Sequence, residues 1–385
     1  MTSTLKKRTF WIAAVVAVLL FLFLGPGMLK AYAKYVLTVE ADKTITVSFN
    51  EYPTLSEKDS WYKGPDRNTV KAIHFVQNLP ENVTADAEWN AADKETVPVK
   101  CVLSGADLYI SSEGASRIIA NRNSQKLFMG FPNMESVTGL GMLDTSETID
   151  LSYMFEGCES LKSIDVSALK TQNTKTLYRM FGNCTELTSV TGFNSETWDT
   201  SNVKNFGGMF YNCSHLASVN LEGLETTSAT SLRSMFYRCS ALYAVSGFNS
   251  DSWDTSNVED MTDMFFGCKN LIDIDVGAFR TAKVISMAQM FYGCTELQNI
   301  MGLSAWDISS VQYMTSMFGH CRNLSSLNFS NWTFEDLAKT DSQNMLLRTG
   351  ENREDFYIEC MDETVKDWIV SNTGWNGTGE IRITA

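Results

Sequence analysis

A short phrase recurs along this chain of 385 residues and restricts what the chain can fold into. The pattern Met-Phe-x-x-Cys occurs seven times, and a degenerate copy that begins at Leu127 has Phe131 in place of the cysteine. Successive copies begin 27, 26, 29, 26, 29, 26 and 27 residues apart. A fixed period of this length is typical of solenoid proteins, in which each repeat packs on its neighbours. We therefore assign the repeated residues to the structural core: Met154, Phe155, Cys158, Met180, Phe181, Cys184, Met209, Phe210, Cys213, Met235, Phe236, Cys239, Met264, Phe265, Cys268, Met290, Phe291, Cys294, Met317, Phe318 and Cys321.

The spacing inside one repeat predicts the form of each coil. From Met261 to Cys268 the apolar residues fall at positions i, i+3, i+4 and i+7, which share one face of a helix. From Ile272 to Val276 apolar residues alternate with aspartates, which predicts a strand with Ile272 and Ile274 on one face. The sequence thus predicts an α/β solenoid of about eight coils, each with a short helix followed by a short parallel strand.

Every second repeat carries a longer loop after its strand. The phrase Trp-Asp-Thr-Ser-Asn-Val spans 253–258, and it has a second copy at 198–203 and a looser one at 306–311. This loop predicts a bulge on one edge of every second coil. Its aspartates have two interpretations: they cap turns through backbone N–H groups, or they form a ladder that binds calcium. Two coils separate neighbouring aspartates, roughly 10 Å at the usual strand spacing, and this distance favours capping. The aspartates are Asp199, Asp254 and Asp307.

Residues 34–125 lack the repeat and predict a β-rich N-terminal cap. Two alternating segments within 36–49, together with the segment 72–76, predict strands. A Ser-Gly-Ala turn within 99–110 predicts a hairpin. A solenoid needs a cap because a bare terminal coil would expose its apolar core to water.

After Trp332 the repeat decays, and a small α/β C-terminal cap is predicted. A closing strand at 356–360 precedes a helix from Asp362 to Val370, with Asp362 as the N-cap. A terminal strand is predicted at 380–384. The predicted domains are a leader or anchor at 1–33, an N-terminal cap at 34–125, a solenoid at 126–333 and a C-terminal cap at 334–385.

The N-terminus is typical of a secretory signal. Cations at 6–8 precede an unbroken apolar run at 10–24, and Ala31-Tyr32-Ala33 offers a small-x-small cleavage site. The run is long for a signal and short for a comfortable membrane span, which leaves two alternatives. The leader is removed after Ala33, or residues 10–24 are retained as a membrane anchor and make the only membrane contact. Both alternatives predict an extracellular or cell-surface location, secreted or anchored.

The cysteines are expected to be free and buried. Seven of the nine cysteines occupy the same position of the repeat. Equivalent positions of neighbouring coils lie about 4.8 Å apart, but side chains in one column point the same way and not toward each other. Free cysteine behaves as a small buried hydrophobe, which favours reduced core thiols over disulfides. No Cys-x-x-Cys or His-rich spacing in the sequence indicates zinc.

Charge and histidine content argue against several classes of function. A net charge of −14 argues against nucleic acid and against an anionic membrane surface as partners. The three histidines, His74, His215 and His320, do not belong to a Ser-His-Asp or Cys-His set at any motif spacing. We therefore expect no enzyme activity, no catalytic residues, no cofactor and no metal. Glycosylation sequons at Asn183, Asn212 and Asn331 arise from the repeat itself.

The repeat also resembles that of a known family. Residues 253–274 read Trp-Asp-Thr-Ser-Asn-Val-x-x-Met-x-x-Met-Phe-x-x-Cys-x-x-Leu-x-x-Ile, which resembles the repeat of BspA-like leucine-rich-repeat surface proteins of bacteria. The resemblance covers about 127–332, and the flanks at 106–112 and 360–368 are similar too. It implies a leucine-rich-repeat-like solenoid in an exported or cell-surface protein without enzyme activity, which in some members is an adhesin. This chain has no evident wall-sorting tail, so its mode of attachment stays open.

Binding is expected at the positions that vary between coils. Solenoids present an extended face made of such residues, and small polar residues with aspartates suit a protein or glycan partner. We therefore predict that the strand face binds an extracellular protein or glycan. Two alternatives stay open: these residues are merely solvated, or the protein is a structural surface spacer without a specific ligand. The predicted ligand-binding face comprises Lys162, Asp165, Thr188, Asn220, Tyr243, Asp273, Asp275, Gln298 and Asn299.

Overall fold

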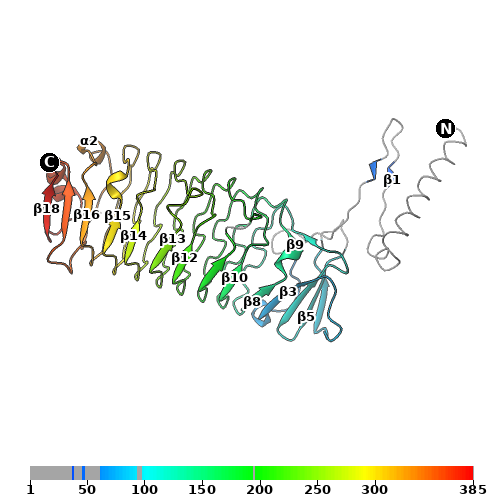
Figure 1. Cartoon of the computed structure of the whole chain (residues 1–385). Helices are drawn as coiled ribbons and strands as arrows, with labels where there is room; N and C mark the ends of the chain where they lie inside the picture. The colour runs from blue at the N-terminus through cyan, green and yellow to red at the C-terminus, as the bar shows by residue number, and fades with distance from the viewer. Residues whose placement is uncertain (1–36, 39–45, 48–60, 93–97, 194–195, 385) are drawn as a thin grey trace, which may run out of the picture.

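The chain forms a stack of coils that follow one another in sequence order along a single long axis (Figure 1). The computed structural model describes residues 37–38, 46–47, 61–92, 98–193 and 196–384. The predicted leader at 1–33, with its apolar run, lies outside the described residues. Within the described ranges, no helix is both long enough and apolar enough to cross a membrane.

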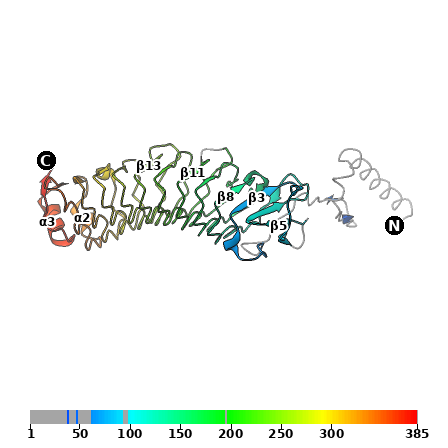
Figure 2. The same ribbon diagram turned by 90° about the horizontal axis from the view of Figure 1, so that it is seen from below.

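Short parallel strands, one per coil, line up along the stack as predicted, but most of them pair two by two and do not form one continuous sheet (Figures 1 and 2). Paired strands run in register, so that Asp273 lies opposite Asn299 and Asp275 lies opposite Met301. In most of these strands the central residue is buried and its two neighbours face solvent, because side chains alternate along a strand. The strands are β10 (Ser163–Asp165), β11 (Ser189–Thr191), β12 (Ser218–Asn220), β13 (Ala244–Ser246), β14 (Asp273–Asp275), β15 (Asn299–Met301) and β16 (Ser326–Phe329).

A second set of backbone contacts joins the coils along the Met-Phe segments. Single parallel bridges connect equivalent residues of successive coils, for example Asp260 and Ser286. Every second N–H group donates to the next coil, as the Phe265 N–H does to the Met290 carbonyl oxygen across 2.8 Å. These segments therefore hold the coils together in the manner of a parallel sheet.

The structure corrects the prediction of a helix in each coil. Between Met261 and Cys268, the N–H groups that bond within the coil reach the carbonyl oxygen three residues earlier, which forms successive tight turns. Asp263 and Gly267 have left-handed backbones, with φ of 59° and 70°, and an α-helix contains no such residues. The i, i+3, i+4, i+7 spacing fits both forms. A helix keeps its backbone bonds inside the coil, whereas these turns leave N–H donors to bond the next coil.

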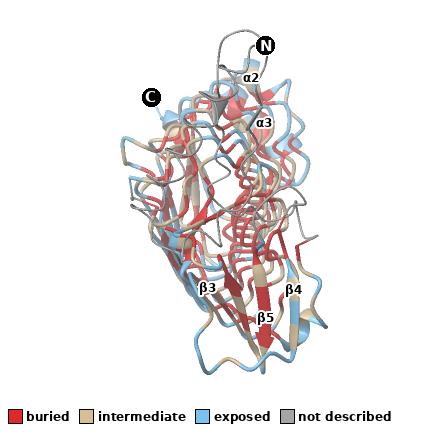
Figure 3. Cartoon of the chain, turned by 90° about the vertical axis from the view of Figure 1, so that its right-hand side faces the viewer, coloured by how far each residue is buried: buried red, intermediate tan, exposed pale blue. Residues whose placement is uncertain are grey.

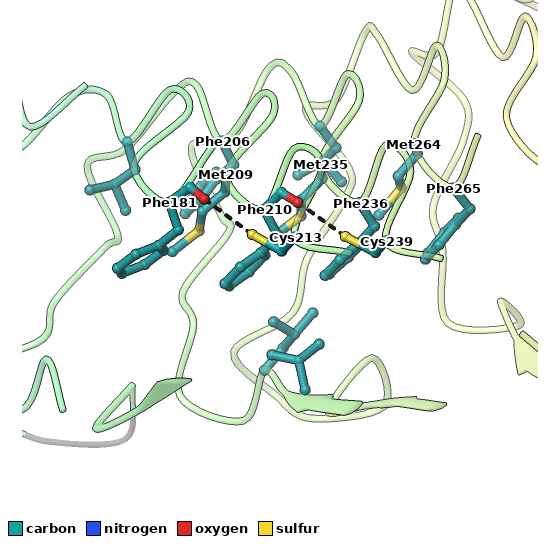
Figure 4. Packing of buried hydrophobic residues seen from close by; sticks show 14 of the residues in the cluster. Phe181, Phe206, Met209, Phe210, Cys213, Met235, Phe236, Cys239, Met264 and Phe265 are labelled. Atoms are coloured by element: carbon teal, nitrogen blue, oxygen red, sulfur yellow. Dashed lines mark hydrogen bonds between the residues drawn. The ribbon is translucent and has the colours of Figure 1, made fainter. Parts of the chain in front are cut away.

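The Met-Phe-x-x-Cys residues fill the interior of the stack. Every predicted core residue is fully buried, and Figure 3 shows buried residues running through the inside of the coils. The phenylalanines stack ring on ring: the Phe265 centroid lies 5.4 Å from that of Phe236 and 5.5 Å from that of Phe291. Methionine and cysteine side chains pack beside the rings (Figure 4). Each coil must present the same side chain as its neighbour for this stacking to continue, which explains the repeated phrase.

All nine cysteines lie within the described residues, and all are free thiols. Each repeat thiol donates a hydrogen bond to the carbonyl oxygen of the phenylalanine one coil earlier, across 3.0 to 3.1 Å. Burial raises the pKa of Cys239 and of Cys294 to about 12. Among the described side chains, no group of three or more His, Cys, Asp or Glu could hold a metal ion.

The N-terminal region forms a separate five-stranded sheet at the start of the stack. β3 (Ala72–Val76) pairs in parallel with β8 (Ser136–Thr138), within a sheet of order β4-β5-β6-β3-β8. The predicted hairpin is confirmed by β5 (Lys100–Ser104) and β6 (Asp107–Ser111), which pair antiparallel. Trp61 packs edge-on against Phe128, and its indole N–H donates to the Leu127 carbonyl oxygen, so the core is covered at this end. The other elements of this part are β1 (Leu37–Thr38), antiparallel with β2 (Thr46–Val47), η1 (Arg67–Thr69), β4 (Ala87–Asn90), β7 (Ile118–Ile119), η2 (Leu140–Met142) and β9 (Leu143–Asp144).

In the C-terminal region, β17 (Tyr357–Cys360) and β18 (Glu380–Ile383) join β16 in a parallel three-stranded sheet. The predicted helix is confirmed as α3 (Glu363–Asn372), and the Asp362 carboxylate caps it by accepting from the Val365 N–H across 2.9 Å. The helix covers the last coil with buried apolar residues, while the domain boundaries at 125 and 333 stay predictions. The other short elements here are η3 (Leu303–Ala305) and α2 (Phe334–Leu337).

Candidate functional site

The strand face presents a variable surface on a uniform interior. Its middle column is buried in every coil from β10 to β15 except β13, where Val245 is partly buried. The flanking positions point to solvent and differ from coil to coil. The structure places all nine residues of the predicted binding face at exposed positions: Lys162, Asp165, Thr188, Asn220, Tyr243, Asp273, Asp275, Gln298 and Asn299.

Two exposed apolar residues of this face were missed by the sequence analysis. Ile272 was predicted to share a face with Ile274, but β14 begins only at Asp273, so Ile272 is 42% exposed and Ile274 is 4% exposed. Met301 ends β15 and is 51% exposed. Alignment of the repeats could have identified Ile272 as a surface position, because most other coils have a polar residue there, as at Thr188.

The Trp-Asp aspartates act as turn caps. Their Oδ1 atoms accept hydrogen bonds from the N–H two residues later, across 3.0 Å at Asp199, 2.9 Å at Asp254 and 3.0 Å at Asp307. The Ser309 hydroxyl also donates to Asp307 Oδ1, and this bond together with the Ser309 N–H bond lowers the pKa of Asp307. The alternative of a calcium ladder lacks a converging ligand set, since no acidic cluster of metal-binding geometry occurs in the described coils.

Alternation of long and short loops produces a groove on one edge. The loop before Trp253 and the turn at Asp307 flank the shorter turn that contains Arg280, and the groove between them has a volume of about 620 Å³. Its lining includes the nearly buried rings of Phe248 and Phe279. The walls carry both signs of charge, and the groove therefore indicates no single class of ligand.

The fold brings one histidine next to a hydroxyl and a carboxylate from distant parts of the sequence. His74 Nδ1 lies 2.8 Å from Thr138 Oγ1, His74 Nε2 lies 3.7 Å from Asp107 Oδ1, and the ring stacks on Tyr109. These residues occupy β3, β8 and β6, which explains why no motif spacing revealed them. The Asp107 side chain is 48% exposed, so water competes for its charge and would screen any reaction there. His74, Thr138 and Asp107 therefore form a polar network at the surface.

A second histidine also has a structural role. His215 Nδ1 contacts the Thr185 carbonyl oxygen at 2.7 Å and lies 3.6 Å from Glu186. His320, whose ring lies tilted against that of Tyr292, has its pKa lowered by burial and by the neighbouring arginines.

Two of the sequon asparagines belong to a partly buried polar ladder. Asn183 Nδ2 donates to Glu156 Oε1 across 2.8 Å, and Asn212 Nδ2 donates to Asn183 Oδ1 across 2.9 Å. Burial raises the pKa of Glu156, although Arg179 lies 3.5 Å away and opposes the shift. Both amide nitrogens are thus committed to bonds between coils, which favours their assignment to the repeat scaffold.

Comparison with solved structures finds leucine-rich repeat proteins. A protein from Eubacterium ventriosum is 14% identical with a TM-score of 0.33, over 55% of this chain and 54% of that one, so the match spans about half of its length. A protein from Bacteroides ovatus is 13% identical with a TM-score of 0.22, over 92% and 98% of the two chains. The pneumococcal vaccine antigen PcpA is 12% identical with a TM-score of 0.24, over 91% and 96%.

Comparison by sequence gives a family. No curated protein matches the chain. One family matches twice, over residues 122–248 and 240–356, and these ranges include every Met-Phe-x-x-Cys repeat. The matches together span more than half of the chain. The chain therefore belongs to the family described as "Mycoplasma protein of unknown function, DUF285".

Proposed function

We propose that this protein is an exported, non-enzymatic bacterial surface protein whose strand face binds an extracellular protein or glycan. One observation supports the proposal above the others: the interior of each coil repeats the same residues, while the exposed strand positions change from coil to coil. A scaffold needs only the interior to repeat. A row of solvent-facing positions that varies from coil to coil is what an extended recognition surface requires.

The same proposal includes export of the protein and its relationship to the BspA-like proteins. The resemblance of residues 253–274 to the BspA-like repeat supports a surface location, as does the cation, apolar run and small-x-small pattern within 6–33. Mass spectrometry of the native N-terminus tests this part. A mature chain that starts at Lys34 supports secretion. A chain in the membrane fraction that retains residues 10–24 supports anchoring. An intact chain in the cytoplasm contradicts export.

Binding is tested with a screen of immobilised matrix proteins, glycan arrays and whole bacteria. The test variant replaces the nine predicted strand-face residues with alanine. The control variant carries Lys204→Ala, Glu259→Ala and Gln312→Ala, which are exposed residues on the edge of the Met-Phe segments. We expect the test variant to lose an interaction that the control keeps. An interaction that survives in both variants contradicts the strand face as the site, and the lack of any interaction favours the structural spacer.

A further inference from the structure

Three large apolar side chains lie exposed on three successive coils of the strand face. Tyr243, Ile272 and Met301 are 53%, 42% and 51% exposed. Tyr243 precedes β13 by one residue and Ile272 precedes β14 by one residue, so the two occupy the same position of neighbouring coils. Met301 belongs to β15, which pairs in parallel with β14. Met301 is aligned with Asp275, so it lies one coil beyond Ile272 and roughly 10 Å further along the strand direction. The three side chains therefore line one stretch of the strand face.

The scaffold does not require these apolar residues. The position of Ile272 is occupied by Thr188 and Gln298 in other coils, and that of Met301 by Thr191 and Asn220. All of these alternatives are exposed in the same structure. Apolar side chains in water contribute little to folding, and clustered exposed ones mark contact surfaces. A partner that covers them would supply the burial that the isolated chain lacks.

Two carboxylates lie between the apolar residues. Asp273 and Asp275 follow Ile272 on β14, and Asp275 pairs directly with Met301. Asp273 Oδ1 accepts from Asn299 Nδ2 across 2.6 Å, and Asp275 Oδ1 accepts from the Gly277 N–H. Neither carboxylate forms an ion pair within the described residues. The area therefore offers two uncompensated negative charges beside apolar surface.

This combination selects one class of partner. A glycan has no apolar side chains to cover Ile272 and Met301, and its hydroxyl groups would lose water against them. An anionic membrane is repelled by the aspartates and by the net charge of −14. A polypeptide with alternating apolar and cationic side chains satisfies both parts, because Lys or Arg pairs with carboxylates while its neighbours bury apolar area.

We propose that Tyr243, Ile272, Asp273, Asp275 and Met301, here named the β14 patch, form the docking site for a polypeptide segment that carries Lys or Arg beside apolar residues. This inference rests on the proposed function and assigns the class of its partner. Apolar contact with Tyr243, Ile272 and Met301 supplies most of the affinity, and the charge pairs orient the segment and speed its association.

The test uses the full chain and a random dodecapeptide phage library as the probe. Selected peptides are synthesised and their Kd is measured by fluorescence anisotropy. Two test variants are Ile272→Ser with Met301→Ser, and Asp273→Asn with Asp275→Asn. The matched control is Ile285→Ser with Tyr313→Ser, which removes two exposed apolar residues from successive coils on the other edge. Circular dichroism checks that each variant keeps the fold of the parent.

We expect enrichment of peptides that contain Lys or Arg next to apolar residues. Each test variant should weaken their binding by about tenfold or more, while the control stays within about twofold. Added salt should weaken binding to the parent and have less effect on the Asp→Asn variant. The inference is overturned if no peptide is enriched, if the peptides lack cations, or if the test variants bind like the control. If the inference fails but glycans bind in a way that depends on the strand face, the proposed function still holds. If neither peptides nor glycans bind, both the inference and the proposed function are contradicted.

Discussion

The Cys213 thiol donates a hydrogen bond to the Phe181 carbonyl oxygen of the preceding coil across 3.1 Å (Figure 4). The same oxygen also accepts from the Cys184 N–H of its own coil across 3.2 Å. The carbonyl thus uses both lone pairs, one inside the coil and one between coils. Alanine would fill part of the space but would not donate. The thiol donor therefore gives a physical reason for cysteine at this position of every full repeat.

Removal of one thiol should destabilise the stack locally. Cys239→Ala deletes the bond from Sγ to the Phe210 carbonyl oxygen and leaves a small cavity. We expect a loss of about 1–2 kcal/mol in the free energy of unfolding, measured by urea denaturation. Thr227→Ala at an exposed loop position is the control and should change stability by less than about 0.5 kcal/mol. Equal stability of the two variants would show that the thiol contributes nothing.

The repeat thiols should resist alkylation in the folded protein. Burial raises the pKa of Cys158, Cys239 and Cys294 to about 12, so the reactive thiolate is scarce and shielded. At about pH 8, iodoacetamide followed by peptide mass spectrometry should label repeat cysteines only after denaturation. Rapid labelling of the native protein, or disulfide-linked repeat peptides in it, would contradict the buried, reduced column.

Glu156 should make the stability of the protein depend on pH. Burial raises the pKa of this carboxyl in the folded state, so the folded chain binds its proton more tightly than the unfolded chain. Stability from this group is present at low pH and is lost as pH rises from about 4.3 through the folded-state pKa. Relative to the parent, Glu156→Gln should therefore gain stability between about pH 4 and pH 8 in urea titrations. A difference between parent and variant that does not change with pH would refute the assignment.

Two tyrosines of one coil should respond differently to truncation. The Tyr237 ring stacks at 4.6 Å on Tyr211 and at 4.6 Å on Phe266, whereas Tyr243 projects from the strand face. Tyr237→Ala should cost roughly 1–3 kcal/mol, because two stacked pairs are lost. Tyr243→Ala should stay within about 0.5 kcal/mol, and thermal or urea unfolding compares the two variants. A larger effect at Tyr243 would mean that the exposed ring supports the fold.

Local patterns predicted the flanking elements well. Asp362 and the apolar residues after it indicate α3, and the Ser-Gly-Ala turn indicates the hairpin of β5 and β6, because caps and turns depend on neighbouring residues. The same approach failed at Ile272, where strict alternation extended the strand by one residue. The start of β14 depends on pairing with β15, which lies in the next coil.

The sequence by itself determined that the chain stacks coils around a column of Met, Phe and Cys, since a continuous interior requires each coil to repeat its neighbour. Only the tertiary structure decided how the backbone is bonded. The Met-Phe segments form turns and not helices because Phe265 finds its acceptor on Met290 in the next coil. Side-chain spacing is local and visible in the sequence, whereas the partners of these N–H groups, of the cysteine thiols and of His74 come from distant segments that only the fold brings together.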